Sequence, residues 1–225
     1  MSTRVAVIQF PGTNCELDVV RALEGLGATA EAVFHTASDL GGADAVIVPG
    51  GFAHGDYLRT GAIAQFSPVM EAVAAHARAG GPVVGVCNGF QVLTEAGLLP
   101  GALQKNVGLT FLCTTVEVRV ESTRSVLTNR VELGRVLRIP INHFEGNYTC
   151  DAATLERLRD GDQIVLRYLD NPNGSIDDIA GISNEAGNVV GLMPHPERAS
   201  EPILGSDDGV VLLESLLSVA TGAQV

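Results

Sequence analysis

A cysteine stands where an apolar strand meets a helix, in residues 83–89. Gly85-x-Cys87-x-Gly89 has the spacing of the G-x-S-x-G nucleophile elbow, with sulfur in place of oxygen. In such an elbow a strained turn carries the side chain out of the sheet, and the flanking glycines relieve crowding. The helix predicted over 88–97 directs its free N–H groups and positive dipole end at the sulfur, which favours the reactive thiolate. The alternative is a buried structural cysteine, and the spacing alone leaves both interpretations open.

A base and an orienting acid for this nucleophile stand near the other end of the chain. An apolar strand predicted over 189–193 leads into Pro194-His195-Pro196-Glu197. In an extended segment, residues two apart point to the same side, so the side chains of His195 and Glu197 are expected to project together. The histidine would accept the thiol proton, and the carboxylate would orient the imidazole. The alternative is a loop histidine beside a solvated glutamate.

Paired glycines follow another predicted strand, over 44–48. Gly50 and Gly51 allow the backbone to approach a ligand closely and to turn N–H groups inward. One of these N–H groups, together with the amide of Asn88, could form an oxyanion hole. A simple glycine turn is the alternative.

The elements that must position these groups alternate along the chain. Apolar strands and amphipathic helices follow each other in βαβα order up to the elbow, which predicts a doubly wound, mostly parallel α/β sheet of the flavodoxin-like type. Over 110–122 the pattern changes to a period of two, which indicates antiparallel strands added to that sheet. Sites in such sheets gather at the carboxyl ends of strands, where both the elbow and the histidine lie. No linker or repeat interrupts 1–225, so a single domain is expected.

Composition excludes several classes of function. The formal net charge of −12, with one lysine, argues against a nucleic-acid surface, because phosphate binding requires clustered basic residues. The sequence has no apolar run of membrane-spanning length and no signal-peptide pattern, so we expect a cytoplasmic protein without a membrane partner. Its four cysteines, which show no metal-ligand spacing, predict neither a metal site nor a disulfide. Apart from Cys87 they are expected to be packing residues: Cys15, Cys113 and Cys150.

These motifs resemble a known family. The elbow around Cys87, the Pro49-Gly50-Gly51 turn and the Pro-His195-Pro-Glu197 segment are similar to those of the triad-type, class I glutamine amidotransferases. Two longer segments, 10–16 (Phe-Pro-Gly-Thr-Asn-Cys-Glu) and 50–64, resemble the family of glutaminase subunits of phosphoribosylformylglycinamidine synthase. The resemblance extends over nearly the whole chain. One departure is Phe144, which stands where that family more often has glycine in a His-Gly-Glu-Gly segment.

The resemblance implies a reaction. Cys87 would attack the side-chain amide of L-glutamine, with Gly51 and Asn88 holding the oxyanion, His195 transferring protons and Glu197 orienting it. By the family pattern the substrate contacts would be Gly50, Phe52, Gln91 and Asn106. Ammonia would pass to a synthetase subunit, which works with a small third subunit. The synthetase would use this ammonia to convert formylglycinamide ribonucleotide to formylglycinamidine ribonucleotide in de novo purine biosynthesis. The resemblance implies no cofactor in this chain, because ATP and magnesium would be used by the synthetase.

Two other functions remain open on the residues alone. One is a different thiol hydrolase on the same sheet, such as a γ-glutamyl hydrolase; the other is a non-catalytic interaction subunit. We also expect the glycine-punctuated segment 52–64 to contact the synthetase, so that the isolated chain has low activity. A rigid loop that only shapes the pocket is the alternative.

Overall fold

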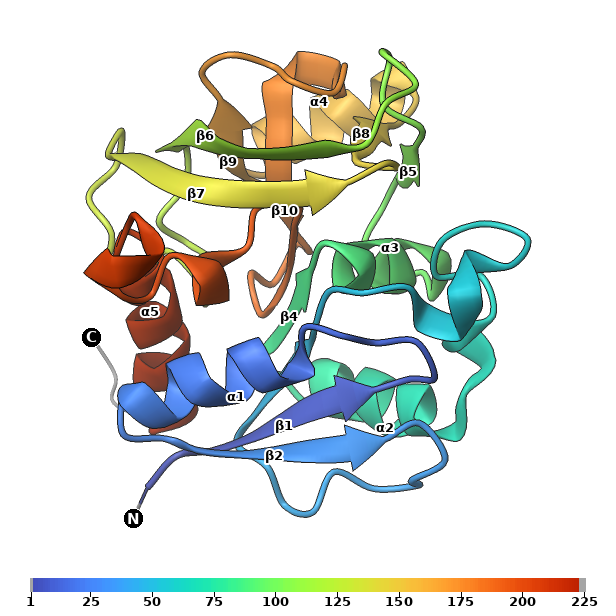
Figure 1. Cartoon of the computed structure of the whole chain (residues 1–225), viewed down its shortest axis with the longest axis vertical. Helices are drawn as coiled ribbons and strands as arrows, with labels where there is room; N and C mark the ends of the chain where they lie inside the picture. The colour runs from blue at the N-terminus through green and yellow to red at the C-terminus, as the bar shows by residue number, and fades with distance from the viewer. Residues whose placement is uncertain (1, 223–225) are drawn as a thin grey trace.

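A nine-stranded mixed sheet forms the centre of the computed structural model, which describes residues 2–222 (Figure 1). In spatial order its strands are β2 (Thr29–Phe34), β1 (Arg4–Gln9), β3 (Ala45–Val48), β4 (Val83–Val86), β11 (Val189–Leu192), β10 (Ile179–Ser183), β9 (Ile164–Tyr168), β6 (Leu112–Val120) and β7 (Val136–His143). From β2 to β11 neighbouring strands are parallel, and from β11 to β7 they are antiparallel. The predicted fold class, a mostly parallel doubly wound sheet with antiparallel additions, is confirmed.

The parallel half is built as the alternating pattern predicts. Strands β3 and β4 are buried throughout, as expected of strands covered on both faces. Helix α1 (Glu16–Gly25) connects β1 to β2, and α2 (Pro68–Arg78) connects β3 to β4 in the opposite direction across the sheet. Right-handed crossovers in opposite directions place their helices on opposite faces, and Figure 1 shows α1 in front of the strands and α2 behind. Helix α3 (Asn88–Glu95) follows β4, and α5 (Val210–Ala220) is the last helix of the described residues.

The antiparallel half lies above the parallel half in Figure 1. Along β6 the side chains alternate between buried valines and exposed polar residues from Val116 to Val120, as the period of two predicts. Three elements here were not predicted: a two-stranded sheet of β5 (Ala102–Gln104) and β8 (Asn147–Thr149), and helix α4 (Ala152–Asp160). Helix α4 begins at an Asp151 N-cap, whose carboxylate accepts the N–H of Thr154.

Strands β4 and β11 are parallel neighbours at the centre of the sheet. Val86 pairs in register with Leu192, so the two strands end at the same level. The residues that follow them, Cys87 and the 193–197 segment, therefore leave the sheet at adjacent points. This pairing brings the two ends of the predicted site together from more than a hundred residues apart in sequence. No helix within residues 2–222 has both the length and the apolar character needed to cross a bilayer.

Candidate active site

Cys87 occupies the strained turn expected of a nucleophile elbow. Its backbone has φ 51° and ψ −107°, between the last residue of β4 and the first of α3. A Cβ atom at Gly89 would overlap the carbonyl oxygen of Val48, and one at Gly85 would lie 2.6 Å from Leu93 Cδ1. Both glycines are therefore required for α3 to pack this closely on the ends of β3 and β4. The strain costs stability and is held by that packing.

His195 and Glu197 form a buried pair. The Nδ1 atom of His195 lies 2.6 Å from Glu197 Oε1, and both side chains are almost fully buried. The backbone N–H of His195 donates to the carbonyl of Pro140 on β7, which fixes the start of this segment. The prediction that the two side chains meet is confirmed, but the expected extended backbone was wrong. Residues Pro196–Arg198 form a 3-10 turn, η4, because the proline favours the φ of a helical first turn.

The electrostatics of this pair favour a charged imidazole. Burial lowers the pKa of His195, but the carboxylate of Glu197 and the sulfur of Cys87 together outweigh burial and raise the pKa above its ordinary value. The Nε2 atom of His195 is buried and has no hydrogen-bond partner among the described residues. A nitrogen in that position is available to exchange a proton with a reacting group.

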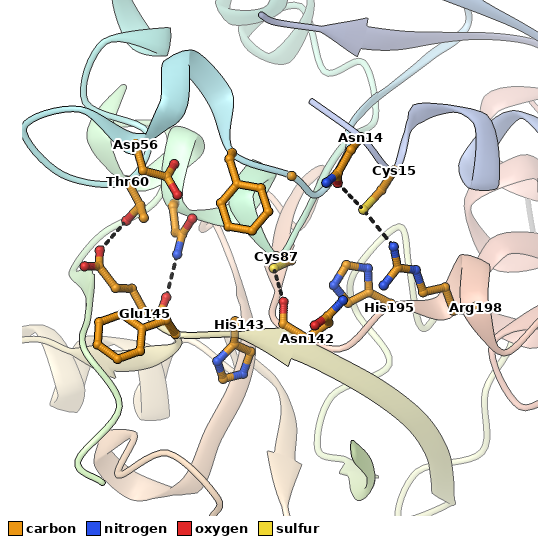
Figure 2. A pocket seen from close by; sticks show the side chains of 14 residues that line it. Asn14, Cys15, Asp56, Thr60, Cys87, Asn142, His143, Glu145, His195 and Arg198 are labelled. Carbon is orange, nitrogen blue, oxygen red and sulfur yellow. Dashed lines mark hydrogen bonds between the residues drawn. The ribbon is translucent and has the colours of Figure 1, made fainter. Parts of the chain in front are cut away.

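A single pocket of about 260 Å³ contains both the sulfur and the imidazole (Figure 2). It is lined by Asn14, Cys15, Gly51, Phe52, Asp56, Thr60, Cys87, Gln91, Asn142, His143, Phe144, Glu145, His195 and Arg198. The sulfur of Cys87 lies 3.6 Å from the carbonyl oxygen of Asn142 on β7. A Cβ atom at Gly50 would lie 2.8 Å from His195 Cε1 and 3.4 Å from Cys87 Cβ. Gly50 therefore packs against both Cys87 and His195, which explains the need for glycine there.

Two backbone N–H groups fit an oxyanion hole beside the sulfur. Gly51 has φ 142°, and a Cβ there would collide with the backbone of Thr13 and Asn14, so only glycine fits. Within residues 2–222 the Gly51 N–H donates to no other backbone group. The N–H of Asn88 is the first of α3 and has no partner within the helix. Gly51 lines the pocket and Asn88 directly follows Cys87, and the N–H groups of both are unused by the backbone.

The side chain of Asn88 ties these two donors together. Its Oδ1 atom accepts the N–H of Ala53, two residues beyond Gly51, at 2.9 Å. Its Nδ2 atom donates to Gln91 Oε1 at 2.8 Å and to Asp56 Oδ1 at 3.3 Å. A buried amide with all these contacts fixes the glycine loop against the start of α3.

The four predicted substrate contacts fall in different places. Phe52 and Gln91 line the pocket, but the Gln91 side chain is already engaged with Asn88 and with the carbonyl of Glu145. Gly50 contacts the catalytic side chains as described above. Asn106 is buried outside the pocket lining. Its side chain donates to the carbonyls of Thr110 and His143 and accepts the N–H of Gly146, so it supports the wall of the pocket from behind.

Residues 143–145 form that wall. His143 is buried, and neither ring nitrogen has a partner among the described residues. Burial and then the charge of His195 lower the pKa of His143 to about 4, so its imidazole is neutral near pH 7. Phe144 has no positive φ and lies beneath Lys105, whose Nζ is 6.0 Å from the ring centroid. A side chain is therefore tolerated where the resemblance led us to expect glycine.

Sequence reasoning missed several polar residues of the pocket, among them Cys15, Asp56 and Arg198. Cys15 was predicted to be a packing residue; it is buried but also lines the pocket, where Arg198 Nη2 donates to its sulfur at 3.2 Å. Burial and then the charge of Glu197 raise the pKa of Cys15 to about 12, so it stays a thiol. Its place in the segment 10–16 and that of Arg198 directly after Glu197 were the available signals.

Three potential metal ligands also meet here. One ligand atom each from Cys15, His195 and Glu197 lies within 4.8 Å of the others. The His195–Glu197 hydrogen bond already uses two of these groups, and the guanidinium of Arg198 adds a positive charge beside the sulfur of Cys15. This cluster is therefore explained by the catalytic arrangement, and a site without metal remains our prediction.

The arrangement can perform acyl transfer. A thiol at a strained turn, a buried imidazole oriented by a carboxylate, and two free N–H groups are the parts that attack on an amide carbonyl requires. The sulfur supplies the electrons, the imidazole moves protons and the N–H groups stabilise the oxyanion. Because Cys15 is held as a thiol, Cys87 is the nucleophile that the geometry supports.

Comparisons with known proteins agree with this chemistry. The family described as CobB/CobQ-like glutamine amidotransferase domain matches residues 2–207. A protein named phosphoribosylformylglycinamidine synthase subunit PurQ, from Rubrobacter xylanophilus, is 57% identical over 217 residues, which cover 96% of this chain and 99% of that protein. A protein of the same name from Lacticaseibacillus paracasei is 53% identical over 223 residues, or 99% of this chain and 98% of that protein. The solved structure of PurLQS from Thermotoga maritima contains a chain with a TM-score of 0.90 and 41% identity, covering 97% of this chain and 99% of that one.

Proposed function

The chain belongs to the PurQ family of class I glutamine amidotransferases, and from that premise we propose that it is the glutaminase subunit of a phosphoribosylformylglycinamidine synthase. It hydrolyses L-glutamine and supplies ammonia for the ATP-dependent conversion of formylglycinamide ribonucleotide to formylglycinamidine ribonucleotide in purine biosynthesis. The chemistry of hydrolysis follows from the pocket residues.

The first half of the reaction forms a thioester. The Cys87 thiolate attacks the side-chain amide carbon of glutamine, and the electron pair of the carbonyl moves to the oxygen held by Gly51 and Asn88. The imidazolium of His195 donates its Nε2 proton to the amide nitrogen. The carbon–nitrogen bond then breaks, ammonia leaves, and a γ-glutamyl thioester remains on Cys87.

The second half releases glutamate. Neutral His195 removes a proton from water, and the resulting hydroxide attacks the thioester carbon. His195 becomes the imidazolium when it takes this proton, and collapse of the second tetrahedral intermediate then breaks the carbon–sulfur bond and expels the Cys87 thiolate. Glu197 orients the imidazole and stabilises its charge in both halves.

One observation carries the proposal: the pocket lined by Cys87 is also lined by His195, whose ring is paired with the buried Glu197, and Gly50 packs against both Cys87 and His195. A different thiol hydrolase would share this triad, but the curated relatives above 50% identity over nearly the full length favour the PurQ assignment.

Mass spectrometry after exposure to a glutamine-like diazo ketone, 6-diazo-5-oxo-norleucine, tests the nucleophile and the substrate class together. We expect one adduct per chain, on Cys87, and protection by excess glutamine. Cys87→Ala should abolish the adduct, whereas the matched variant Cys15→Ala should retain it, because Cys15 is held as a thiol. Labelling of Cys15 with Cys87 unmodified would refute the assignment.

We further propose that a synthetase subunit covers the mouth of the pocket, with a small third subunit in the same assembly. The pocket residue Phe52 is followed along the chain by Tyr57 and Leu58, whose apolar side chains are exposed. The carbonyl of the pocket residue Phe144 accepts the N–H of Asn106, which precedes a second segment with large exposed apolar side chains: Val107, Leu109 and Phe111. The two segments project on the same side of the molecule in Figure 1, at the right. Apolar side chains gathered around a pocket in this way are typical of a protein interface.

A pocket covered by the synthetase would also keep the released ammonia out of the surrounding water. Ammonia is mostly protonated in neutral water and is then not a nucleophile, so direct transfer to the synthetase preserves its reactivity. In this scheme ATP and magnesium are used by the synthetase, and this chain needs no cofactor of its own. We propose the cytoplasm as the place of this reaction.

A further inference from the structure

We propose that Asp56 binds the α-ammonium group of L-glutamine and makes the pocket selective for the free amino acid. The inference rests on the proposed function and extends it to a part of the substrate that does not react. Asp56 lines the pocket, and no step of thioester chemistry uses it.

The position of Asp56 is fixed relative to the oxyanion hole. Its Oδ1 atom accepts a hydrogen bond from Asn88 Nδ2 at 3.3 Å, and the backbone N–H of the same Asn88 is one of the two oxyanion donors. Asp56 ends the short 3-10 segment η1 (Ala53–Asp56) with φ 53°, a strained value for a residue other than glycine. The N–H of Ala53, at the start of η1, donates to Asn88 Oδ1, so both ends of this segment are bound to one side chain.

The resulting span matches glutamine. Four covalent bonds separate the backbone nitrogen of Asn88 from its Nδ2, or about 5 Å at most. With the hydrogen bond of 3.3 Å added, the Asp56 carboxylate lies within about 8 Å of the oxyanion donor. Glutamine spans about 5–6 Å from its amide oxygen to its α-nitrogen and needs about 3 Å for a hydrogen bond at each end. A substrate held at the oxyanion hole can therefore reach Asp56 in a partly bent conformation.

The charges of the pocket fit the same orientation. Figure 2 shows Asp56 and Glu145 on one side of Cys87, and His195 and Arg198 on the other. The side with His195 must exchange protons with the leaving ammonia and with water, which leaves the acidic side for the α-carbon of the substrate. An ammonium group placed there meets a negative potential.

Asp56 is better placed for this contact than the second acid on that side. The Glu145 carboxylate accepts the hydroxyl of Thr60 at 3.0 Å, and its backbone carbonyl is bound by Gln91. Burial and then the charge of Glu145 raise the pKa of Asp56 to about 6, because a half-buried carboxylate near a like charge is disfavoured. A bound ammonium relieves this repulsion, which adds to the affinity for a cationic group.

Two labelling reagents that differ only at the α-carbon test the inference. The first is 6-diazo-5-oxo-norleucine, and the second is 6-diazo-5-oxohexanoic acid, which lacks the α-amino group. The second-order rate of adduct formation on Cys87 is measured by mass spectrometry for both. We expect the wild-type chain to react about 10- to 100-fold faster with the amino acid, as a charge-assisted hydrogen bond provides.

The variant Asp56→Asn keeps the acceptor for Asn88 and removes the charge. It should react with both reagents at rates within about 3-fold of each other, by the loss of that contact. The Tm of Asp56→Asn is compared with that of the wild type to show that the chain is folded, and the ratio of its two labelling rates then reports the loss of the contact with the ammonium group. Glu145→Gln removes a charge from the same side and should keep most of the preference.

The outcomes separate the two proposals. If Asp56→Asn keeps the full preference, or if Glu145→Gln alone abolishes it, the inference about Asp56 is wrong and the glutaminase assignment stands. If the wild-type Cys87 reacts with neither reagent, the proposed function itself fails.

Discussion

Replacing Gly50 with alanine adds one methyl group at the most crowded point of the site. Gly50 does not have a positive φ, so alanine fits the backbone, and the effect comes from packing alone. The new Cβ would lie 2.8 Å from His195 Cε1 and 3.1 Å from Cys15 Sγ, whereas ordinary contact begins at 3.4 Å. The imidazole must therefore move away from its present position or the glycine loop must shift.

The expected loss follows from that displacement. Overpacking of a buried site costs about 1–3 kcal/mol, which lowers the Tm of a chain of this length by roughly 2–4 °C for each kcal/mol. A displacement of about 0.5–1 Å at a catalytic group reduces turnover by about 10- to 100-fold. The chain should thus stay folded, because domains are stable by about 5–15 kcal/mol, while its turnover falls by about 10- to 100-fold.

The assay measures the glutaminase kcat of the assembled complex and the labelling rate of Cys87, together with the Tm. Gly25→Ala is a matched control, because a Cβ at Gly25 meets no atom within 4 Å. Alanine near the end of α1 should leave activity unchanged and raise stability slightly. The double variant Cys15→Ala with Gly50→Ala relieves the sulfur contact but not the ring contact, so its activity should stay low. Wild-type turnover in Gly50→Ala would refute the placement of His195 against this loop.

Three further predictions concern the surroundings of the triad. Asn88→Ala removes the side-chain amide that joins the glycine loop to α3. It should lower the free energy of unfolding by about 1–3 kcal/mol and reduce the labelling rate of Cys87. An unchanged labelling rate would contradict the positioning role of Asn88. The protein should become less stable as the pH falls from 6.5 towards 4, because the unfolded chain binds a proton at residue 143 more readily than the buried His143 does. In urea denaturation, His143 should contribute a slope of up to about 1.4 kcal/mol in the free energy of unfolding per pH unit, and His143→Gln should remove it. Equal slopes in both proteins would be evidence against this role of His143. Asp56, with its raised pKa, contributes the opposite slope in both proteins, so only the difference between them is informative. Leu58→Asp should weaken assembly with the synthetase in sedimentation experiments, whereas Ile203→Asp, at an equally exposed position, should not; equal behaviour of the two would place the interface elsewhere.

Local sequence patterns predicted the elements of this fold well because most of them are buried strands or amphipathic helices. The strands predicted over 44–48 and 189–193 are observed as β3 and β11, each within one residue of the predicted bounds. The pattern failed at α4, a mainly polar helix with only a few apolar side chains, where the Asp151 cap was the remaining signal. It also failed at β5 and β8, which are three residues each and too short to show a period.

In the candidate site, too, some residues could be predicted from a local motif and others could not. Cys87, His195 and Glu197 could be identified because an elbow and a short His-x-Glu motif leave a local mark in the sequence. Asp56 and Arg198 reach the pocket through tertiary contacts with Asn88 and Cys15, which no local spacing encodes. The 3-10 turn at Pro196–Arg198 was missed because proline is compatible with both extended and helical turns.

The central position of β11 has a consequence for synthesis of the chain. This strand is the last of the sheet to leave the ribosome, yet it lies between β4 and β10. A nascent chain that ends before residue 189 has Cys87 but lacks His195 and Glu197, and the edge of β4 remains open to pairing with other chains. Hydrolysis of glutamine therefore requires β11 to be in place, and we expect a chain truncated before residue 189 to release no ammonia and to aggregate through the open edge of β4.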